Sequence, residues 1–336
     1  MKILIYETEL YSSGTRYPFK EAAEDLGHRV DMFDWSFYFP SMSASSISNR
    51  VKDKIFVNRN IAKLNHDLQR IIKLGNYDLF LVLSGKYIYP ATTELATTKI
   101  KYVVNWNTDH PFNKLNSTGW LLESLPMYHA HFSPRIHLKE QYEDFGMKNI
   151  YELNWYYRYG IDLVNSLPTN YQFDSNFIGS WSERRAKYVA AVSDPKMQVF
   201  GWGWNKNINN SKIISEGQIN KSVGIAHMMD IYSASKVNLN LLTVENMDTT
   251  NLRNFEIPAA HGFQLAERSD ALKTIFDEDK EIVLFSSPEE MVDKYKFYMN
   301  NDVARGKIAS AGYNRLVSCN HSLSDRLNKI FSDMGI

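Results

Sequence analysis

The sequence predicts an α/β protein made of two doubly wound domains, each built on a parallel sheet, and three observations lead to this prediction. Short apolar runs alternate with amphipathic segments along the chain, which is the pattern of strands joined by helices in βαβ units. The length of 336 residues suits two ordinary domains better than one. The alternation lapses once, between about Asp162 and Gln172, where Asn, Ser, Pro and Thr dominate as they do in linkers.

In the first half, six short apolar runs are predicted to be strands. They are Lys2–Tyr6, Arg29–Phe33, Asp78–Leu83, Ile100–Asn105, His131–Ser133 and Ile150–Leu153. Apolar residues at helical spacing predict helices between them, and a glycine after the last turn ends each one. These helices are Tyr17–Leu26, Ser48–Leu74 and Leu138–Phe145, closed by Gly27, Gly75 and Gly146.

The second half repeats the alternation. Its predicted strands are Asn176–Gly179, Gln198–Gly201, Val237–Leu242, Phe263–Ala266 and Ile282–Phe285. Its predicted helices are Glu183–Val192, His227–Ala234, Leu252–Ala260, Asp270–Phe276, Pro288–Met299, Val303–Cys319 and Leu323–Met334. We therefore expect a Rossmann-like domain over residues 1–165, a second one over 172–318, and a C-terminal helix in 319–336 that packs back toward the first.

The composition excludes several classes of protein. Lysine and arginine together number 38, as do aspartate and glutamate, so the formal net charge is zero and no chain-wide basic field exists for nucleic acid. The 44% of hydrophobic residues excludes intrinsic disorder, and the one cysteine, Cys319, excludes a disulfide framework. Apolar runs fall short of the ~20 residues of a membrane helix, and the first apolar run is too short for a signal peptide. We expect a cytoplasmic protein without integral membrane contact.

Ligands of doubly wound sheets bind beyond the carboxyl ends of the strands, and two such domains would enclose a cleft. After the first strand, Ser12–Thr15 contains one glycine, Gly14. It lacks both the dinucleotide fingerprint and the phosphate loop, which argues against a dehydrogenase or an NTPase. This segment is either a ligand contact or an ordinary tight turn.

A second candidate segment follows the strand that ends at Asn105. Asp109 and His110 are adjacent there and could supply a general base or bind an acceptor hydroxyl. The alternative is that Asp109 is a turn or helix-capping residue ahead of Pro111. A zinc site is not expected, because no third ligand accompanies His129 and His131.

Two glycine-containing turns follow strands of the second half. Gly179 ends a strand, and the following helix opens with Arg184 and Arg185, a combination that suits a phosphate group because glycine permits close approach and arginine binds phosphate bidentately. A solvated arginine pair is the alternative. After the next strand, the indole of Trp202 or of Trp204 could stack on a nucleobase or pack in the core.

The most informative stretch runs from Asn251 to Phe263. Glu256 lies on an otherwise apolar helix, where a carboxylate needs a partner, and the vicinal hydroxyls of a ribose would provide one. Arg253, one turn earlier, could instead form a structural ion pair with Glu256 or face a diphosphate.

This stretch resembles the CgeB-like family of spore-maturation type glycosyltransferases, which have the two-domain GT-B architecture. The family pattern R-x-F-E-I-P-A-x-G-G-F is similar to the segment from Arg253 to Phe263, with His261 where the pattern has a small residue. The resemblance covers about Asn176–Leu327 and is weaker in the first half. The other matching segments are Phe177–Arg185, Phe200–Trp204, Tyr232–Asn240, Phe285–Glu290, Thr108–Pro111 and Phe132–Gly146.

The resemblance implies transfer of a sugar from a nucleoside diphosphate donor, with a UDP-sugar expected, to an acceptor hydroxyl. It implies no obligatory metal or other cofactor and favours retention of the anomeric configuration. It places Glu256 on the donor ribose and the diphosphate near Gly179, near Arg184 or Arg185, and near the Gly262–Phe263 turn. Trp204, Tyr232 and Arg253 are further candidate donor contacts, and Asp109 or His110 is the candidate on the acceptor side. The resemblance thus makes residues 172–318 the donor domain and residues 1–165 the acceptor-side domain. In the E-x7-E motif of retaining relatives, Asp248 takes the first position, where it is shorter than glutamate.

Two alternatives accompany this prediction. One is a nucleotide-sugar epimerase or hydrolase on the same architecture, and the other is a bilobal binding protein without chemistry. The sequence leaves the acceptor open among a glycan, a protein, a small molecule and a modified nucleobase.

Overall fold

The computed structural model describes residues 1–7, 17–39, 41, 47–114, 116–158, 163, 170–192, 194–205, 219–220 and 223–336. The chain divides into two compact units. The first, here called the N-unit, consists of Met1–Asn154 and Leu323–Ile336, and the second, the C-unit, is Trp155–Ser322. Gly14 lies outside the described residues.

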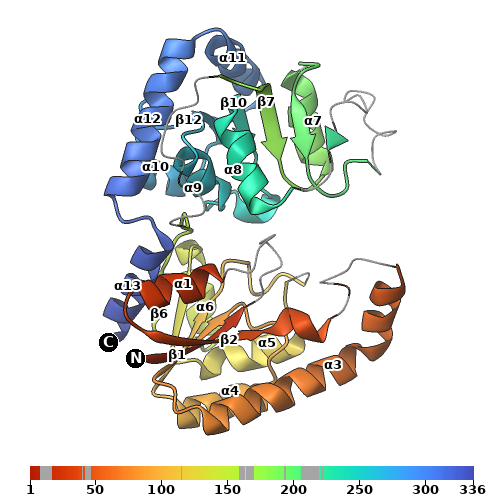
Figure 1. The fold of residues 1–336 in the computed structure, drawn as a ribbon, viewed down its shortest axis with the longest axis vertical. Helices are drawn as coiled ribbons and strands as arrows, with labels where there is room; N and C mark the ends of the chain where they lie inside the picture. The colour runs from red at the N-terminus through yellow and green to blue at the C-terminus, as the bar shows by residue number, and fades with distance from the viewer. Residues whose placement is uncertain are drawn as a thin grey trace. The chain divides into compact units, whose positions relative to one another are not determined.

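Each unit contains a six-stranded sheet, and every pair of neighbouring strands in it is parallel (Figure 1). The N-unit sheet has the order β2-β1-β3-β4-β5-β6. Its strands are β1 (Lys2–Glu7), β2 (Arg29–Asp34), β3 (Leu79–Leu83), β4 (Tyr102–Trp106), β5 (Ala130–Ser133) and β6 (Ile150–Glu152). This arrangement confirms the predicted fold class for the first half.

Helices cover the N-unit sheet. They are α1 (Pro18–Asp25), α3 (Ile47–Leu74), α4 (Pro90–Lys99), α5 (Gly119–Ser124), α6 (Lys139–Asp144) and α13 (Leu323–Met334), with short 3-10 turns η1 (Trp35–Tyr38), η2 (Leu125–Met127) and η3 (Ile136–Leu138). The long helix α3 packs Ile61, Leu64 and Leu68 against the sheet, where they are fully or nearly fully buried. The C-terminal helix α13 lies against the N-terminal segment of this unit, with Phe331 edge-on to His28 at 4.9 Å.

The C-unit sheet has the order β12-β11-β10-β7-β8-β9. Its strands are β7 (Phe173–Ile178), β8 (Gln198–Phe200), β9 (Ile219–Asn220), β10 (Ser235–Asn240), β11 (Gln264–Glu267) and β12 (Val283–Phe285). Its helices are α7 (Glu183–Val192), α8 (Ile225–Ser233), α9 (Arg253–Ala259), α10 (Asp270–Ile275), α11 (Pro288–Met299) and α12 (Asp302–Ser318), and a 3-10 turn, η6, spans Val244–Asn246.

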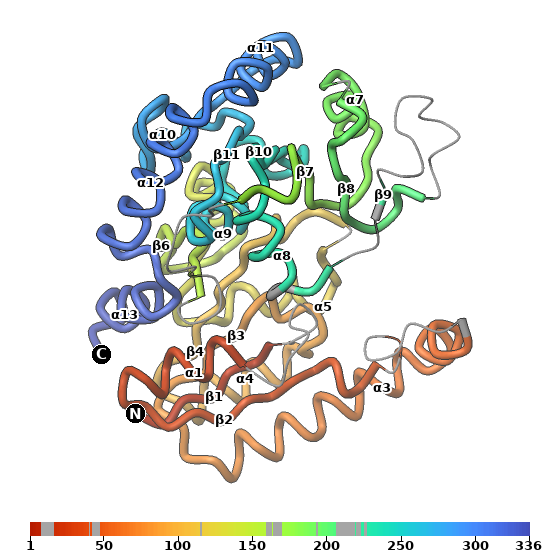
Figure 2. Tube along the Cα trace, turned by 45° about the horizontal axis from the view of Figure 1, so that its top comes forward, coloured from red at the N-terminus to blue at the C-terminus, as the bar shows by residue number. Residues whose placement is uncertain are grey.

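Successive side chains of these strands enter different core clusters, as expected for a sheet with both faces covered. Phe177 contacts the cluster that includes residues of α7 and α11, whereas the next residue, Ile178, contacts the cluster that includes residues of α8 and α9. Leu265 and Ala266 of β11 divide in the same way between two clusters. The tube view in Figure 2 shows α7 and α8 beside the strands that they connect.

Among the helices and strands of the described residues, three were absent from the sequence-based prediction. Helix α4 has a threonine-rich sequence with Thr92 and Thr93 buried, and α5 is six residues long. Strand β9 has two residues. Each lacks the repeated apolar spacing on which the prediction depends, so only packing against neighbouring elements identifies them.

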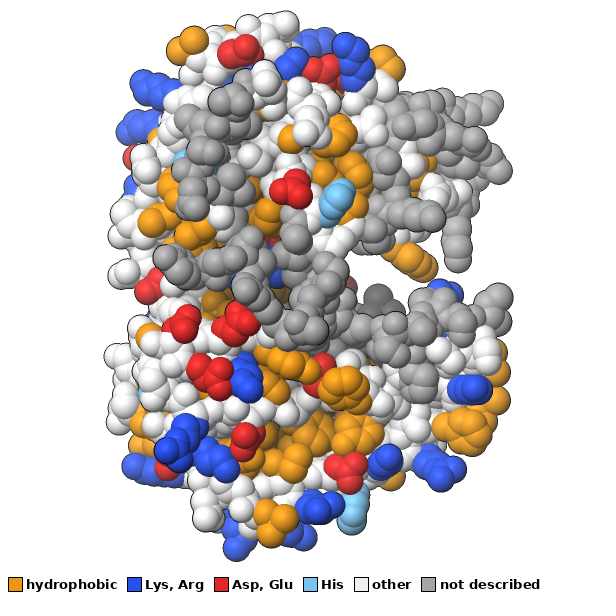
Figure 3. Space-filling model, in the orientation of Figure 1, with side chains coloured by type: hydrophobic (Ala, Val, Ile, Leu, Met, Phe, Trp, Pro, Cys, Tyr) orange, Lys and Arg blue, Asp and Glu red, His pale blue; other side chains and the backbone are white. Residues whose placement is uncertain are grey.

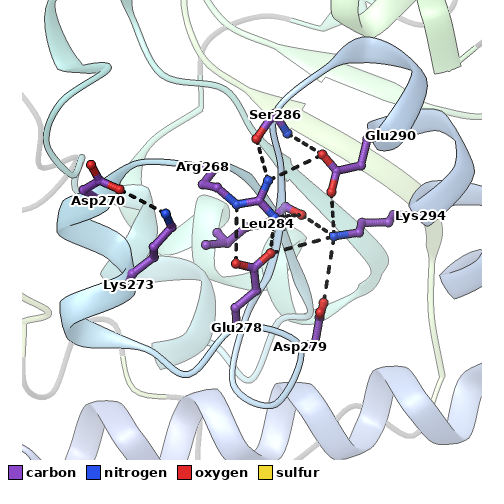
Figure 4. A network of polar contacts seen from close by, with 9 residues as sticks. All are labelled: Arg268, Asp270, Lys273, Glu278, Asp279, Leu284, Ser286, Glu290 and Lys294. Atoms are coloured by element: carbon purple, nitrogen blue, oxygen red, sulfur yellow. Dashed lines mark hydrogen bonds and ion pairs between the residues drawn. The ribbon is translucent and has the colours of Figure 1, made fainter.

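An ion-pair network joins β11, β12 and α11 in the C-unit (Figure 4). Arg268 bonds to Glu278 and lies 3.5 Å from Glu290, and Lys294 lies 2.9 Å from Glu290. The backbone N–H of Ser286 donates to Glu290 at 2.8 Å. Burial raises the pKa of Glu290, but Lys294, Ser286 and Arg268 outweigh burial and bring it from 4.5 to about 2.

This network predicts a pH-dependent stability. Because the pKa of Glu290 is lower in the folded protein, its contribution is complete above about pH 4.5 and is lost as the pH falls toward 2. Glu290→Gln should therefore lower the free energy of unfolding by about 1 kcal/mol at pH 7. Urea unfolding at pH 7 and at pH 3 measures the difference in free energy of unfolding between wild type and Glu290→Gln. This difference should be smaller at pH 3. A difference that grows as the pH falls would contradict this assignment.

Candidate functional site

The strand order of the C-unit reverses between β7 and β10. The chain runs outward from β7 through β8 to β9 and then returns to place β10 on the other side of β7. Such a topological switch point opens a crevice beyond the carboxyl ends of the two strands, which is where ligands of doubly wound sheets bind. Gly179 follows β7 directly, and Leu241 and Leu242 follow β10. The predicted donor-side residues cluster around this point.

The turn after β7 is held by the turn after β8. The backbone N–H of Gly179 donates to the Phe200 carbonyl at 2.9 Å. A Cβ atom on Gly201 would lie 2.1 Å from the Gly179 carbonyl oxygen, and Gly201 has φ +145°. Glycine is therefore required at position 201, because the two turns approach too closely for a side chain.

Trp204 has a structural position, which corrects the prediction that it contacts the donor. It is 1% exposed, donates from Nε1 to the Gly179 carbonyl at 2.8 Å and lies edge-on to Phe177 at 5.8 Å. A buried indole with its N–H already bonded cannot stack on a nucleobase without leaving the core. Trp202, in contrast, is 68% exposed.

We expect Trp204→Phe to lower stability and leave nucleotide affinity unchanged. The substitution leaves the Gly179 carbonyl without its donor, which costs about 1–3 kcal/mol. Urea unfolding measures this loss of stability. Calorimetry measures the affinity for UDP, which should stay within about twofold of the wild-type value, because the lost hydrogen bond is internal to the protein. A tenfold weaker affinity for UDP in a folded variant would instead restore Trp204 to the donor site.

Arg184 and Arg185, at the start of α7, reach the segment that follows β10. Arg184 donates to the Leu242 carbonyl at 3.3 Å and pairs with Glu267 at the end of β11. Arg185 donates to the Leu241 carbonyl at 2.9 Å and to the Ser180 carbonyl at 3.1 Å. The two arginines thus connect the carboxyl ends of β7, β10 and β11. Burial, together with the positive charges of Arg253 and Arg184, lowers the pKa of Arg185 to about 10.

Glu256 is paired with Arg158, and not with Arg253 as in the structural alternative that the sequence left open. Its Oε1 accepts a hydrogen bond from Nη2 of Arg158, and the two side chains are 1% and 6% exposed. The other oxygen, Oε2, is buried and accepts no hydrogen bond from the described residues. A buried carboxylate oxygen without a donor is costly, so this atom is suited to accept a hydroxyl of a ligand.

Arg253 lies at the first residue of α9, one turn before Glu256 and therefore on the same side of the helix. No carboxylate among the described residues lies within 4.0 Å of its guanidinium. Burial lowers the pKa of Arg253, but the neighbouring Tyr232 hydroxyl and Glu256 carboxylate outweigh burial, and the net direction is upward. Arg253 therefore keeps its positive charge.

The cluster carries an excess of positive charge. It contains four guanidinium groups and two carboxylates among the described residues. They are Arg158, Arg184, Arg185 and Arg253, with Glu256 and Glu267. Because a diphosphate is a multiply charged anion, it would neutralise this excess.

Buried polar contacts fix the segment between β10 and α9. The amides of Asn240 and Asn251 exchange hydrogen bonds of 3.2 and 2.9 Å. Asn254 accepts from the Asn251 backbone N–H at 2.8 Å, and Trp155 donates from its indole to the Thr250 carbonyl at 3.0 Å. These contacts set where α9 begins and hence where Arg253 and Glu256 lie. Asp248, the shorter acid of the E-x7-E comparison, is exposed in this segment.

The turn between α9 and β11 is shaped by packing. A Cβ atom on Gly262 would lie 2.8 Å from Nδ2 of Asn238 and 3.0 Å from Ile257, so glycine is required there. Phe263 is 3% exposed and packs on Tyr298 with ring centroids 4.7 Å apart. His261 has φ +54° and stacks on Tyr313 at 3.6 Å. At this turn, a ligand could therefore meet backbone atoms rather than the Phe263 ring.

The acceptor-side candidates follow β4 in the N-unit. Asp109 is exposed, and its backbone N–H donates to the side chain of Asn107 at 3.1 Å. His110 is half-buried and accepts from the Phe112 backbone N–H at 3.3 Å. The buried Arg135 donates to the Thr108 carbonyl at 3.4 Å. The segment is thus fixed by polar contacts, and the Asp109 side chain is exposed to solvent.

Arg158 is the residue that the sequence analysis missed. It follows a bridge between Tyr157 and Ser322, and Tyr157 packs in the same core cluster as Phe255 of α9. Arg158 and Glu256 are 98 positions apart, and no local pattern marks the arginine. The available signal was indirect, since a glutamate on an apolar helix requires a buried cation somewhere in the fold.

Among the described residues, no group of three or more histidine, cysteine, aspartate or glutamate side chains has a geometry that could hold a metal ion. Metal independence remains a prediction. No helix in the described part of the chain combines the length and the apolar character that crossing a membrane requires.

Residues 166–332, just under half of the chain, match the model of a family described as glycosyl transferase-like. The match confirms the predicted enzyme class, a glycosyltransferase, for this part of the chain. No curated protein sequence matches the chain significantly.

Many solved structures share this fold, among them the following three. Sucrose-phosphate synthase from Thermosynechococcus elongatus is 8% identical with a TM-score of 0.67, and the alignment covers 100% of this chain and 99% of that one. An alpha-glucosyltransferase in complex with UDP-glucose and DNA containing an abasic site is 14% identical with a TM-score of 0.64, covering 100% of both chains. A T4 phage BGT mutant in complex with UDP-glucose is 16% identical with a TM-score of 0.62, also covering 100% of both. These likenesses confirm the predicted GT-B fold.

Proposed function

We propose that this protein transfers a sugar from a nucleoside diphosphate sugar, with a UDP-sugar as the expected donor, to an acceptor hydroxyl. The observation that carries the proposal is the buried Oε2 atom of Glu256, which accepts no hydrogen bond from the described residues, one turn of α9 from the half-buried guanidinium of Arg253 and beside the switch point of the C-unit sheet. The similar structures with UDP-glucose support the choice of donor.

In this proposal, Glu256 binds the ribose of the donor. Its Oε2 atom accepts a hydrogen bond from a ribose hydroxyl, while Oε1 stays on Arg158. Because the carboxylate is buried and already held by a guanidinium, it is fixed before the donor arrives, which reduces the entropy lost on binding.

Arg253 binds the diphosphate in this proposal. Cleavage of the bond between sugar and phosphate increases the negative charge on the departing diphosphate, and a positive charge fixed in advance stabilises that charge. Arg184 and Arg185 are bonded to Glu267 and to backbone carbonyls, so they hold the segment after β10 and add their charge to the local field. The backbone of the Gly179 turn lies beside them.

Asp109 is proposed as the general base, or the hydroxyl-binding group, for the acceptor. Asp109→Asn should lower the transfer rate by about 100- to 10,000-fold, because the amide cannot take a proton. Calorimetry should give the Asp109→Asn variant the same dissociation constant for UDP as the wild type. The reason is that Asp109 belongs to the N-unit, whereas the proposed donor contacts belong to the C-unit. His110→Asn is the matched variant. A larger loss of transfer in His110→Asn than in Asp109→Asn would assign the base to His110 instead.

The function is tested first by binding and then by product. A panel of nucleotide sugars is screened for a rise in melting temperature, because a ligand that binds only the folded state stabilises it. The selected donor is then incubated with glycan, protein, small-molecule and modified-DNA acceptors, and mass spectrometry detects a product heavier by one sugar. Free sugar alone would indicate a hydrolase, an isomerised donor would indicate an epimerase, and an unchanged donor would indicate a binding protein.

The CgeB-like character and retention at the anomeric carbon belong to the same proposal. The NMR coupling constant of the anomeric proton in the product tests retention directly. Inversion would leave the proposed donor site unchanged but would overturn the proposed retention of the anomeric configuration.

A further inference from the structure

The outward side of α3 is basic along its length. The helix has 28 residues, with seven lysines and arginines and two aspartates. At about 100° per residue, the side opposite the buried Ile61, Leu64 and Leu68 carries no acidic residue. Its cations are Lys52, Arg59, Lys63, Arg70 and Lys73, all exposed, and none forms an ion pair with a described residue.

The two aspartates of α3 lie off this side and are bonded elsewhere. Asp53 accepts the backbone N–H of Ser41 at 2.8 Å, and Asp67 accepts the hydroxyl of Tyr38 at 2.9 Å. Both are half-buried. The five outward cations therefore form no ion pair with either aspartate of α3, although Asp67 lies one turn from Lys63.

Large apolar side chains lie among these cations toward the first turns of α3. Ile55 is 67% exposed, Phe56 is 46% exposed and Val51 is 50% exposed, and the neighbouring η1 adds Phe37 at 78%. Figure 3 shows Lys, Arg and hydrophobic side chains gathered over α3 along the lower right edge of the N-unit. Single exposed apolar residues are ordinary, but an apolar group flanked by unpaired cations marks an interaction surface.

We propose that this surface, here called the α3 face (Lys52, Ile55, Phe56, Arg59 and Lys63), docks on a lipid bilayer that contains anionic lipids. The cations would be attracted to the negative headgroups, and Ile55 and Phe56 would enter the boundary between headgroups and acyl chains. The helix would lie in the plane of the interface. The proposal does not depend on the proposed sugar transfer.

The mixture of side chains favours a bilayer over a nucleic acid. Phosphate contacts to a nucleic acid need cations and hydrogen-bond donors, and they leave exposed isoleucine and phenylalanine in water. A bilayer surface satisfies both kinds of side chain at once. The net charge of zero for the whole chain also makes a general attraction to nucleic acid weak.

Co-sedimentation of the full chain with vesicles tests the proposal. The protein should bind vesicles of equal parts phosphatidylcholine and phosphatidylglycerol at 0.1 M salt, and should bind pure phosphatidylcholine at least about tenfold more weakly. Binding should fall at 0.5 M salt, because the Debye length shortens. Absence of binding to the anionic vesicles, or equal binding to both kinds, would overturn the proposal.

Two double variants separate the two contributions. Lys52→Glu/Arg59→Glu should weaken binding to the anionic vesicles by at least about tenfold, and Ile55→Ser/Phe56→Ser should weaken it even at low salt. The matched control is Lys148→Glu/Lys307→Glu, which changes the net charge equally at exposed lysines away from α3 and should bind like the wild type.

The remaining outcomes also decide the question. Equal loss in the control and in Lys52→Glu/Arg59→Glu would mean that net charge rather than the α3 face binds the vesicles, which would overturn the proposal. Tighter binding to a DNA duplex than to vesicles, unaffected by Ile55→Ser/Phe56→Ser, would assign the face to nucleic acid. Circular dichroism and melting temperatures should match the wild type, since all the altered side chains are exposed.

Discussion

Arg253→Ala is expected to reduce the rate of sugar transfer by about 100- to 1,000-fold, the usual effect of removing one preorganised group that stabilises charge in a transition state. The guanidinium has no carboxylate within ion-pair distance among the described residues, so its charge is available to the donor diphosphate. Its removal should not unfold the protein. The positive charge of the half-buried Arg253 contributes to the lowered pKa of Arg185, so the substitution relieves a repulsion between neighbouring cations.

The measurement compares kcat/KM for transfer with affinities for UDP and for uridine. Affinity for UDP should fall and affinity for uridine should not, because only UDP carries the diphosphate. Arg315→Ala is the control, since Arg315 pairs with Glu281 at 2.7 Å elsewhere in the C-unit. It should leave transfer unchanged. Equal affinity of wild type and Arg253→Ala for UDP would remove Arg253 from the diphosphate site.

Glu256→Gln is expected to have two large effects. Affinity for UDP should fall by about 10- to 100-fold, because a charged hydrogen bond to the ribose is lost. The free energy of unfolding should fall by about 3–5 kcal/mol, the usual cost of removing one member of a buried ion pair. Calorimetry and urea unfolding measure the two effects separately.

A second variant distinguishes a lost contact from a damaged fold. Arg158→Gln/Glu256→Gln removes both members of the buried ion pair and should be more stable than Glu256→Gln, since removing one member of such a pair is the costlier change. Its affinity for UDP should remain low. Glu281→Gln, which alters another glutamate paired with an arginine in the same unit, is the control for UDP binding.

A further measurement addresses the ribose itself. Wild type should bind UDP more tightly than 2′-deoxy-UDP, and Glu256→Gln should bind the two nearly equally. A variant that still prefers UDP by the wild-type factor would show that another group contacts the ribose hydroxyls, and Glu256 would then have a structural role only.

Local sequence patterns predicted most elements of the fold. Helix α7 was expected over Glu183–Val192 and α11 over Pro288–Met299, and the structure gives the same bounds. The signals were strong because each helix follows a strand, carries polar residues in its first turn and repeats apolar residues at helical spacing. Helix α4 was missed because its buried residues include threonines, which periodicity in apolar side chains does not detect.

The candidate site was only partly predictable. Glu256 and Arg253 were identified because a charged residue on an apolar helix is costly and therefore informative. The role of Trp204 was wrong, because a strand that ends in glycines and tryptophans looks the same whether the indole faces a ligand or the core. The interpretation of Arg184 and Arg185 changed too, since their contacts are carbonyls and a carboxylate from distant strands.

The sequence by itself determined that the chain forms two parallel α/β sheets, and it predicted that the segment from Arg253 to Phe263 bears the chemistry, because both follow from the spacing of residues close together in the chain. Only the tertiary structure decided that Glu256 pairs with Arg158 and that Arg253 lacks an ion pair with any described residue. Pairing between residues 98 positions apart depends on strand order and packing, which bring them together only after the sheet has formed.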